Sequence, residues 1–227
     1  MLVADAVASG VALEGVYAEV DALTGELDGA LRGAGIEPTL VQPGGLGRVL
    51  DTTTPRPVAA IAPLPDHRLG GAVRCDLALV LVDVADPGNV GTLIRTAEAA
   101  GAGVVVCCGS SADPFGPKAV RASAGSILRV AVVVDQDAGA TLDALAEAGT
   151  TRLGLAAGAS DVYDQVDLSV PVAVVLGSEA HGLPSDLSSR LDQVVSIPMA
   201  GRVESLNVAT AGAIVCFESA RQRRARG

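Results

Sequence analysis

Asn89 and Arg95 lie in the first of three segments whose residue types could serve a ligand site. The preceding Pro87-Gly88 pair predicts a turn, Asn89 is suited to the N-cap of a helix, and Arg95 would lie less than two turns into that helix. The segment has too few glycines for the GxGxxG motif of a dinucleotide site. In an alternative interpretation, Arg95 is an exposed helix residue paired with Glu98, three positions further on.

Glu179 is the candidate in the second segment, where Gly177 and Gly182 flank it directly after an apolar stretch. Because Ser178 follows Gly177 immediately, the segment does not match the GxSxG nucleophile elbow of lipases. The alternative interpretation is a turn that leads into a short helix, in which the Glu179 carboxylate is solvated.

The third segment, residues 197–209, combines an Ile-Pro-Met sequence with the polar residues Ser205 and Asn207. Ser205 is suited to the N-cap of a final helix. The start of that helix is rich in small residues, which would allow close packing against another element: Ala209, Ala211, Gly212 and Ala213.

All three segments follow predicted strands, which is where ligands bind in an open α/β sheet. Apolar strand-like runs alternate with Ala-rich helical stretches along the chain, so the sequence predicts an α/β fold. We expect strands at residues 16–20, 39–42, 58–62, 77–82, 104–108, 127–134, 153–157, 172–176 and 194–197. We expect helices at residues 21–33, 89–100, 118–124, 140–148 and 206–223.

A domain boundary is predicted within residues 62–71, where two prolines are followed by two closing glycines. We therefore expect a small domain over residues 1–65, a linker over 66–75 and a larger domain over 76–227.

The composition excludes several classes of protein. The 227 residues are 49% hydrophobic, 19% charged and 2% aromatic, with a formal net charge of −10. A disordered chain is excluded by the low charge, and a stacking platform for single-stranded nucleic acid by the scarcity of aromatic residues. The acidity also excludes coating of nucleic acid by bulk charge, so composition alone makes RNA or DNA a poor candidate partner.

Cysteine and histidine content argues against a metal site and for a reducing compartment. None of the four cysteines forms a CxxC pair, so buried thiols are expected, and two histidines are too few for a His-rich site. No apolar run approaches the roughly 20 residues of a membrane helix, and the first residues lack a basic leader. We expect no metal, no membrane contact and a cytoplasmic location.

In order and content, the three segments resemble the SpoU, or TrmH-like, family of RNA ribose 2′-O-methyltransferases in the SPOUT superfamily. That family carries Asn-x-Gly with Arg-Thr-Ala-Glu, then Gly-x-Glu-x-x-Gly, then Ile-Pro-Met with Ser-Leu-Asn. The resemblance covers about residues 76–220, and the stretch 113–125 also looks like the family's inter-motif segment. The matching residues here are Asn89-Val90-Gly91, Arg95-Thr96-Ala97-Glu98, Gly177 to Gly182, Ile197-Pro198-Met199 and Ser205-Leu206-Asn207.

The resemblance implies S-adenosylmethionine as methyl donor, a parallel sheet with a C-terminal trefoil knot, and a homodimer. It places the cofactor against Leu176, Gly177, Ile197, Met199 and Leu206. Gly177 would allow the ligand to approach the main chain closely, and the larger apolar side chains would contact adenine and the methionine arm.

The resemblance also implies catalytic roles in an in-line methyl transfer to a ribose hydroxyl. A guanidinium group keeps its proton in water, which disfavours Arg95 as a simple base, so we expect it to hold the adjacent phosphate and stabilise the developing alkoxide. Asn89 and Asn207 would orient the substrate and the arginine, Ser205 would shape the pocket, and Glu179 would hold neighbouring groups or Arg95.

RNA contacts are implied at Arg95 and Arg121. The tail at residues 221–226 holds four more arginines, with a solvated helix end as the alternative interpretation. Contacts from a few placed arginines predict modest, salt-sensitive binding of structured RNA.

Residues 1 to about 70 resemble, more weakly, the ribosomal-protein-like substrate-binding domain of rRNA-directed members. Residues 51–61 fit the end of that domain. The opening lacks the family's usual basic segment and strand, which leaves open a start codon placed too late or a shortened domain. The presence of this domain favours 23S rRNA as substrate. The alternatives are a tRNA 2′-O-methyltransferase, a catalytically silent RNA-binding paralogue, or a nucleotide-dependent oxidoreductase.

Overall fold

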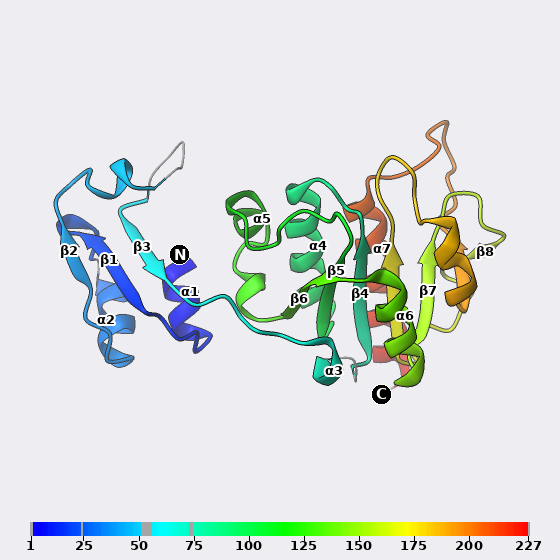
Figure 1. Cartoon of the computed structure of the whole chain (residues 1–227), viewed down its shortest axis with the longest axis horizontal. Helices are drawn as coiled ribbons and strands as arrows, with labels where there is room; N and C mark the ends of the chain where they lie inside the picture. The colour runs from blue at the N-terminus through cyan, green and yellow to red at the C-terminus, as the bar shows by residue number, and fades with distance from the viewer. Residues whose placement is uncertain (1, 24, 51–55, 73–74, 227) are drawn as a thin grey trace. The chain divides into compact units, whose positions relative to one another are not determined.

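The computed structural model describes residues 2–23, 25–50, 56–72 and 75–226 (Figure 1). The chain divides into two compact units, Met1–Pro65 and Asp66–Gly227. Each unit has its own apolar core.

The first unit is a three-stranded sheet whose core lies against two helices. Its elements are α1 (Leu2–Ala8), β1 (Gly15–Glu19), α2 (Gly25–Gly33), β2 (Thr39–Val41) and β3 (Val58–Ile61). The strand order is β2-β1-β3, with β1 parallel to β2 and antiparallel to β3. Alternate residues of β1, Val16 and Ala18, are buried with Leu27 and Leu31 of α2.

One predicted helix of this unit begins at a different residue in the structure. The helix expected over residues 21–33 begins at Gly25, because Val20–Ala22 forms a separate 3₁₀ turn. The α1 helix was not predicted. Part of the stretch assigned to the end of the domain, residues 51–55, lies outside the described residues.

The second unit is built on a seven-stranded sheet in the order β6-β5-β4-β9-β7-β10-β8, with parallel pairing throughout. Three strands, β4, β5 and β9, are buried at every residue, as expected for strands covered on both faces. The strands are β4 (Leu77–Val82), β5 (Val104–Cys108), β6 (Ala131–Gln136), β7 (Thr151–Leu155), β8 (Asp161–Val162), β9 (Val172–Leu176) and β10 (Gln193–Ser196).

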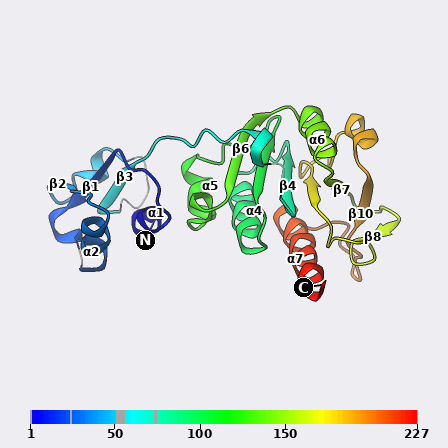
Figure 2. The same ribbon diagram turned by 90° about the horizontal axis from the view of Figure 1, so that it is seen from below.

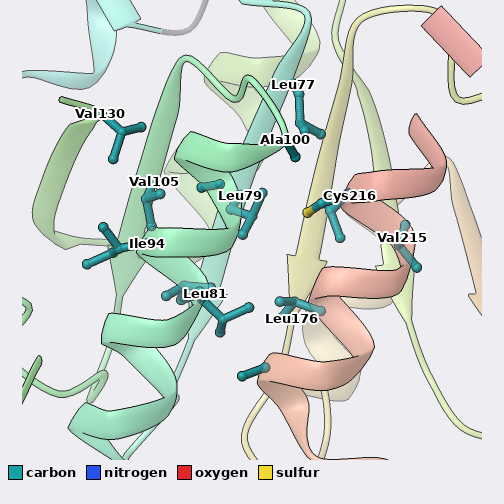
Figure 3. Close-up of a cluster of buried hydrophobic side chains, with 14 of the residues drawn as sticks. Leu77, Leu79, Leu81, Ile94, Ala100, Val105, Val130, Leu176, Val215 and Cys216 are labelled. Atoms are coloured by element: carbon teal, nitrogen blue, oxygen red, sulfur yellow. The ribbon is translucent and has the colours of Figure 1, made fainter. Parts of the chain in front are cut away.

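Helices cover both faces of this sheet, with α4 and α7 on one side and α6 on the other (Figure 2). The core between β4, α4 and α7 includes Leu79, Ile94 and Cys216 (Figure 3). The helices are α3 (Leu69–Ala72), α4 (Pro87–Ala99), α5 (Pro117–Ala122), α6 (Ala138–Glu147) and α7 (Val208–Arg226). Within the described ranges, no helix has the length and apolar character needed to cross a membrane.

Three details of this unit differ from the sequence predictions. The strand expected from residue 127 begins at Ala131, because Gly125, at φ +87°, leads into a 3₁₀ turn over Ser126–Leu128. The segment expected as a linker contains the short helix α3. The two-residue strand β8 was not predicted, and the short helix of the alternative interpretation for the second segment is a 3₁₀ segment over Ser185–Arg190.

Two glycines allow α4 to pack closely against its neighbours. A Cβ at Gly91 would overlap the carbonyl oxygen of Ala119 in α5 and lie 2.6 Å from the Cβ of Ala122. A Cβ at Gly212 in α7 would lie 2.5 Å from Leu93 and 2.8 Å from Leu176. The prediction that small residues in the last helix permit close packing is therefore confirmed at Gly212.

We predict that Gly91→Ala destabilises the second unit. Alanine would gain about 0.5–1 kcal/mol of helix propensity, but the overlap with a backbone carbonyl costs about 1–3 kcal/mol because α5 must shift. Urea unfolding followed by circular dichroism should show a net loss. Gly29→Ala in α2 is the control, since no atom lies within 4 Å of its Cβ position, and a small gain is expected there. A Gly91→Ala protein as stable as wild type would contradict the packing argument.

Candidate functional site

The three candidate segments lie at the carboxyl ends of neighbouring strands. The first connects β4 to α4, the second follows β9, and the third connects β10 to α7. Strands β4 and β9 are adjacent, and β7 separates β9 from β10. Because the strands are parallel, all three segments leave the same edge of the sheet.

A chain of hydrogen bonds joins one side chain from each segment. The amide of Asn207 donates to Oδ1 of Asn89 at 3.0 Å, and the amide of Asn89 donates to Oε1 of Glu179 at 2.7 Å. These residues are 118 and 90 positions apart in the sequence. We call this arrangement the Asn207–Asn89–Glu179 chain.

The orientation of Asn207 is fixed by the start of α7. Its Oδ1 accepts hydrogen bonds from the backbone N–H groups of Ala209, at 2.9 Å, and Thr210, at 3.3 Å. Asn207 is thus the residue that caps α7, and the prediction that Ser205 caps this helix is wrong. With its oxygen held by the helix, the amide NH₂ of Asn207 faces Asn89 as a donor.

The prediction that Asn89 caps α4 is also wrong. The cap is Asp86, whose carboxylate accepts from the N–H of Gly88 at 3.1 Å, and the helix starts at Pro87, which fits the first position. Lys118 donates to the same carboxylate at 2.6 Å, and this bond, followed by that from Gly88, lowers the pKa of Asp86. Asn89 is therefore free to join the other two segments.

Glu179 is held as a carboxylate. Burial alone would raise the pKa of its carboxyl group. The bond from Asn89 and the N–H groups of Glu179, Ala85 and Asp86 outweigh burial, so the pKa is lowered. The side chain is a permanent hydrogen-bond acceptor at neutral pH.

Two cavities meet at this chain of hydrogen bonds. The strand-end cavity, of about 980 Å³, lies against the loops after β7, β9 and β10. The acidic cavity, of about 820 Å³, includes Asp83, Asp86, Asn89 and His181 in its wall. Glu179 lines both.

The strand-end cavity collects most of the predicted site residues. They are the five predicted to hold the cofactor, Leu176, Gly177, Ile197, Met199 and Leu206, together with Glu179, Ser205 and Asn207. The cavity also contains residues that the sequence reasoning missed: Leu155 at the end of β7, Ala156, Ala157 and Gly158 after it, and Leu183 and Leu191. The strand expected over residues 153–157 lies at Thr151–Leu155, so Ala156 and Ala157 belong to the loop at the carboxyl end of the strand, where ligands bind.

Gly177 was expected to let a ligand approach the main chain, but the loop itself also requires a glycine at this position. A Cβ there would overlap the backbone of Gly182 and Leu183, so the glycine lets the loop close on itself. Ser178 and Gly182 exchange backbone hydrogen bonds of 3.1 and 2.9 Å across this loop. The missing side chain thus makes room for the loop's own main chain, while Gly177 still lines the strand-end cavity.

Arg95 and Arg121 lie outside both cavities. Both are exposed, on α4 and α5, and neither guanidinium group makes a hydrogen bond or ion pair with another described residue. The proposed pairing of Arg95 with Glu98 is wrong, because Glu98 accepts from Arg129 at 3.1 Å and from Ser126 at 3.3 Å.

Most arginines of the tail have partners within the chain. Arg221 pairs with Glu218, Arg226 pairs with Asp167, and Arg223 donates to the carbonyl of Ala100 after α4. In this tail, Arg224 is exposed and makes no such contact among the described residues. The solvated, self-paired helix end therefore describes this segment better than an arginine patch.

Three of the four cysteines, Cys107, Cys108 and Cys216, are buried, as expected. Burial raises the pKa of Cys108 to about 11 and that of Cys216 to about 12. In the parts of the chain that are described, no group of three or more His, Cys, Asp or Glu side chains is placed to hold a metal ion.

The chain is similar to curated rRNA methyltransferases. It is 34% identical over 184 residues to the 23S rRNA (guanosine(2553)-2′-O)-methyltransferase RlmP of Bacillus subtilis, which covers 81% of this chain and 72% of the relative. It is 37% identical over 177 residues to the 23S rRNA (uridine(2479)-2′-O)-methyltransferase of Streptomyces viridochromogenes, covering 74% of this chain and 61% of that relative.

Solved structures of the same kind match both units. The SpoU methyltransferase AviRb from Streptomyces viridochromogenes, in complex with the cofactor AdoMet, superposes with a TM-score of 0.86 at 30% identity. This match covers 98% of the chain and 88% of the AviRb chain. Residues 76–217 match the SpoU rRNA Methylase family as a whole. The chain belongs to this family.

Proposed function

We propose that this protein transfers a methyl group from S-adenosylmethionine to a ribose 2′-hydroxyl of 23S rRNA. The observation that carries the proposal is the Asn207–Asn89–Glu179 chain, which joins all three motif segments where two cavities meet. A site between two cavities suits a reaction between a donor and an acceptor.

The strand-end cavity fits the methyl donor. Its volume lies within the range of small-molecule sites. Ile197, Met199 and Leu206 offer apolar surface for an adenine ring, and the backbone around Leu176 and Gly177 offers polar groups that fix orientation. When bound, S-adenosylmethionine supplies an electrophilic methyl group on a sulfonium centre. A relative described in complex with AdoMet supports this assignment.

The protein's own contribution is to position the hydroxyl and to stabilise its charge. Glu179 accepts from Asn89 as a carboxylate, which holds the Asn89 amide in one orientation beside the acidic cavity. Ser205 and Asn207 line the strand-end cavity on the other side of this chain. Alignment of this kind contributes up to roughly 7–11 kcal/mol in favourable reactions.

Arg95 and Arg121 would hold the RNA backbone. Their exposure and lack of partners among the described residues leave both guanidinium groups available to phosphate. The position of Arg95 outside both cavities supports a role at the adjacent phosphate, where it would also stabilise a developing alkoxide.

Ribosomal RNA is the favoured substrate because relatives named as 23S rRNA 2′-O-methyltransferases align with 81% and 74% of the chain. We assign residues 1–65 to RNA substrate binding and residues 76–227 to catalysis. A cytoplasmic location follows from this role.

We propose a C-terminal trefoil knot, which the match to solved SpoU methyltransferases supports. We also propose a homodimer, because Phe217 on α7 and Val203 are apolar and 47% and 63% exposed.

Leu206→Ala should weaken S-adenosylmethionine binding roughly fivefold to tenfold, because part of the apolar cavity wall is removed. Isothermal titration calorimetry on the full chain measures this. Leu40→Ala on β2, 57% exposed in the first unit, is the control and should bind as wild type. Failure of the wild type to bind, or equal affinity of Leu206→Ala, would contradict the cavity assignment.

Arg95→Ala should lower methyl transfer to 23S rRNA about tenfold or more, because a phosphate contact is lost. Tritium transfer from labelled S-adenosylmethionine to an unmodified transcript is the assay, and cofactor affinity should not change. Arg224→Ala removes another exposed arginine and serves as the matched control. Undiminished activity in Arg95→Ala would remove this residue from the mechanism.

Asn207→Asp keeps one role of this residue, the cap of α7, and removes the other, the hydrogen bond donated to Asn89. Aspartate still caps α7, so the free energy of unfolding should stay within about 1 kcal/mol of wild type. It cannot donate to Asn89, so methyl transfer should fall about tenfold or more. Asn207→Ala should lose activity and also about 0.5–2 kcal/mol of stability. Wild-type activity in Asn207→Asp would show that the hydrogen-bond chain is not needed.

A further inference from the structure

Gly154 is a buried residue of β7 whose missing side chain leaves room for the wall of the strand-end cavity. A Cβ at this position would lie 2.7 Å from Cδ1 of Leu191, 3.0 Å from Cδ1 of Leu183 and 3.6 Å from Cγ2 of Val194. All three of these neighbours line the strand-end cavity. Gly154 itself lies outside both cavities, so its effect on a ligand must pass through the neighbouring side chains.

The main chain at Leu191 is held by an ion pair on each side. Arg190 pairs with Asp143 of α6. The carboxylate of Asp192 accepts from the guanidinium group of Arg152 in β7 at 2.8 and 2.5 Å, and from the backbone N–H of Arg152 at 2.8 Å. This second pair is bidentate, and the Arg152 side chain is only 17% exposed, so it is the stronger of the two. The backbone at Leu191 therefore cannot easily move away from β7.

Leu183 is held in a similar way. It directly follows Gly182, which exchanges backbone hydrogen bonds with Ser178 across the closed loop. Both Leu183 and Leu191 pack against a buried cluster that includes Leu142 of α6. A close-packed cluster of this kind cannot absorb an added methyl group. The open volume beside the two leucines is the strand-end cavity, so a side chain on β7 here would displace their ends into it.

We propose that Gly154 is a positioning residue for the methyl donor. By leaving space for the ends of Leu183 and Leu191, it sets the width of the strand-end cavity and hence the size of the S-adenosyl ligand that fits there. This inference rests on the proposed function, which assigns that cavity to S-adenosylmethionine. It adds a residue that acts on the ligand only through its neighbours.

Gly154→Ala should weaken S-adenosylmethionine binding about tenfold or more, because the displaced leucine ends occupy volume that the ligand needs. Isothermal titration calorimetry on the full chain measures this affinity. In methyl transfer to a 23S rRNA transcript, the KM for S-adenosylmethionine should rise by a similar factor. The kcat at saturating cofactor should stay within about threefold of wild type, since a narrower cavity weakens the ground state and the transition state alike.

Leu191→Val in the Gly154→Ala background tests the route through the leucine. Valine has no δ carbon, so the atom nearest to the new methyl group is removed. The double variant should bind S-adenosylmethionine within about threefold of wild type. Leu191→Val alone should also stay within about threefold, because most of the apolar wall remains.

Gly103→Ala is the matched control for a purely structural effect. A Cβ at Gly103, just before β5, would lie 2.5 Å from the Cβ of Cys75, and neither residue lines either cavity. This variant should lower the midpoint of urea unfolding and keep the cofactor affinity of wild type. In Gly154→Ala the overlapped atoms are the ends of side chains beside open volume, so that variant should fold, with a midpoint no lower than that of Gly103→Ala.

Four results would overturn the inference and leave the proposed function standing. The first is wild-type cofactor affinity in Gly154→Ala, and the second is a double variant that binds no better than Gly154→Ala. The third is an equal loss of affinity in Gly103→Ala, because affinity would then follow stability. The fourth is a Gly154→Ala chain that does not fold, because the leucine ends would then not move into the cavity. A wild type that does not bind S-adenosylmethionine would contradict the proposed function itself.

Discussion

The first N–H groups of α7 have no partners within the helix, and the way they are satisfied organises the whole site. Asn207 accepts two of them with its side-chain oxygen, and this leaves its NH₂ facing Asn89. Asn89 must then accept with its own oxygen and donate with its own nitrogen, which requires an acceptor beyond it. The carboxylate of Glu179 is that acceptor. One helix end thus sets the direction of hydrogen bonds through three segments.

The packing of the sheet serves this arrangement. Strands β4, β9 and β10 are parallel to β5 or β7, so their carboxyl ends meet on one edge. Gly212 brings α7 against Leu93 of α4 and Leu176 of β9. Close helix approach therefore sets the separation across which Asn207 and Asn89 must reach. A residue larger than glycine at this contact would change the site without touching it.

Much of the fold could be predicted from the sequence because the core strands are continuous apolar runs. Strands β4, β5 and β9 begin and end at the predicted residues, since full burial leaves little ambiguity about their extent. The helix caps were predicted wrongly at both Asn89 and Ser205. Several polar residues near each helix start are chemically able to cap it, and the choice depends on contacts with residues far away in the sequence.

The site was predictable to a similar degree. The motif residues that line the strand-end cavity were named correctly as neighbours of one another, because the family pattern groups them. Their hydrogen-bond order could not be read from spacing, since Asn89 and Asn207 are 118 positions apart. Arg95 shows a further limit: its helix was predicted, but Glu98 pairs with Arg129, 31 positions further on, and not with Arg95.

The double use of Asn207 has a consequence for the order in which the protein becomes active. The hydrogen-bond chain starts at Asn207, which comes after the loops that follow β4 and β9 in the sequence. Asn207 also caps α7, the last helix to pack on the core. A nascent chain released from the ribosome before α7 has formed would lack the cap, the packing of Gly212 and the donor to Asn89 together. On the proposed function, activity then depends on the docking of α7, and a chain that ends before α7 would be inert.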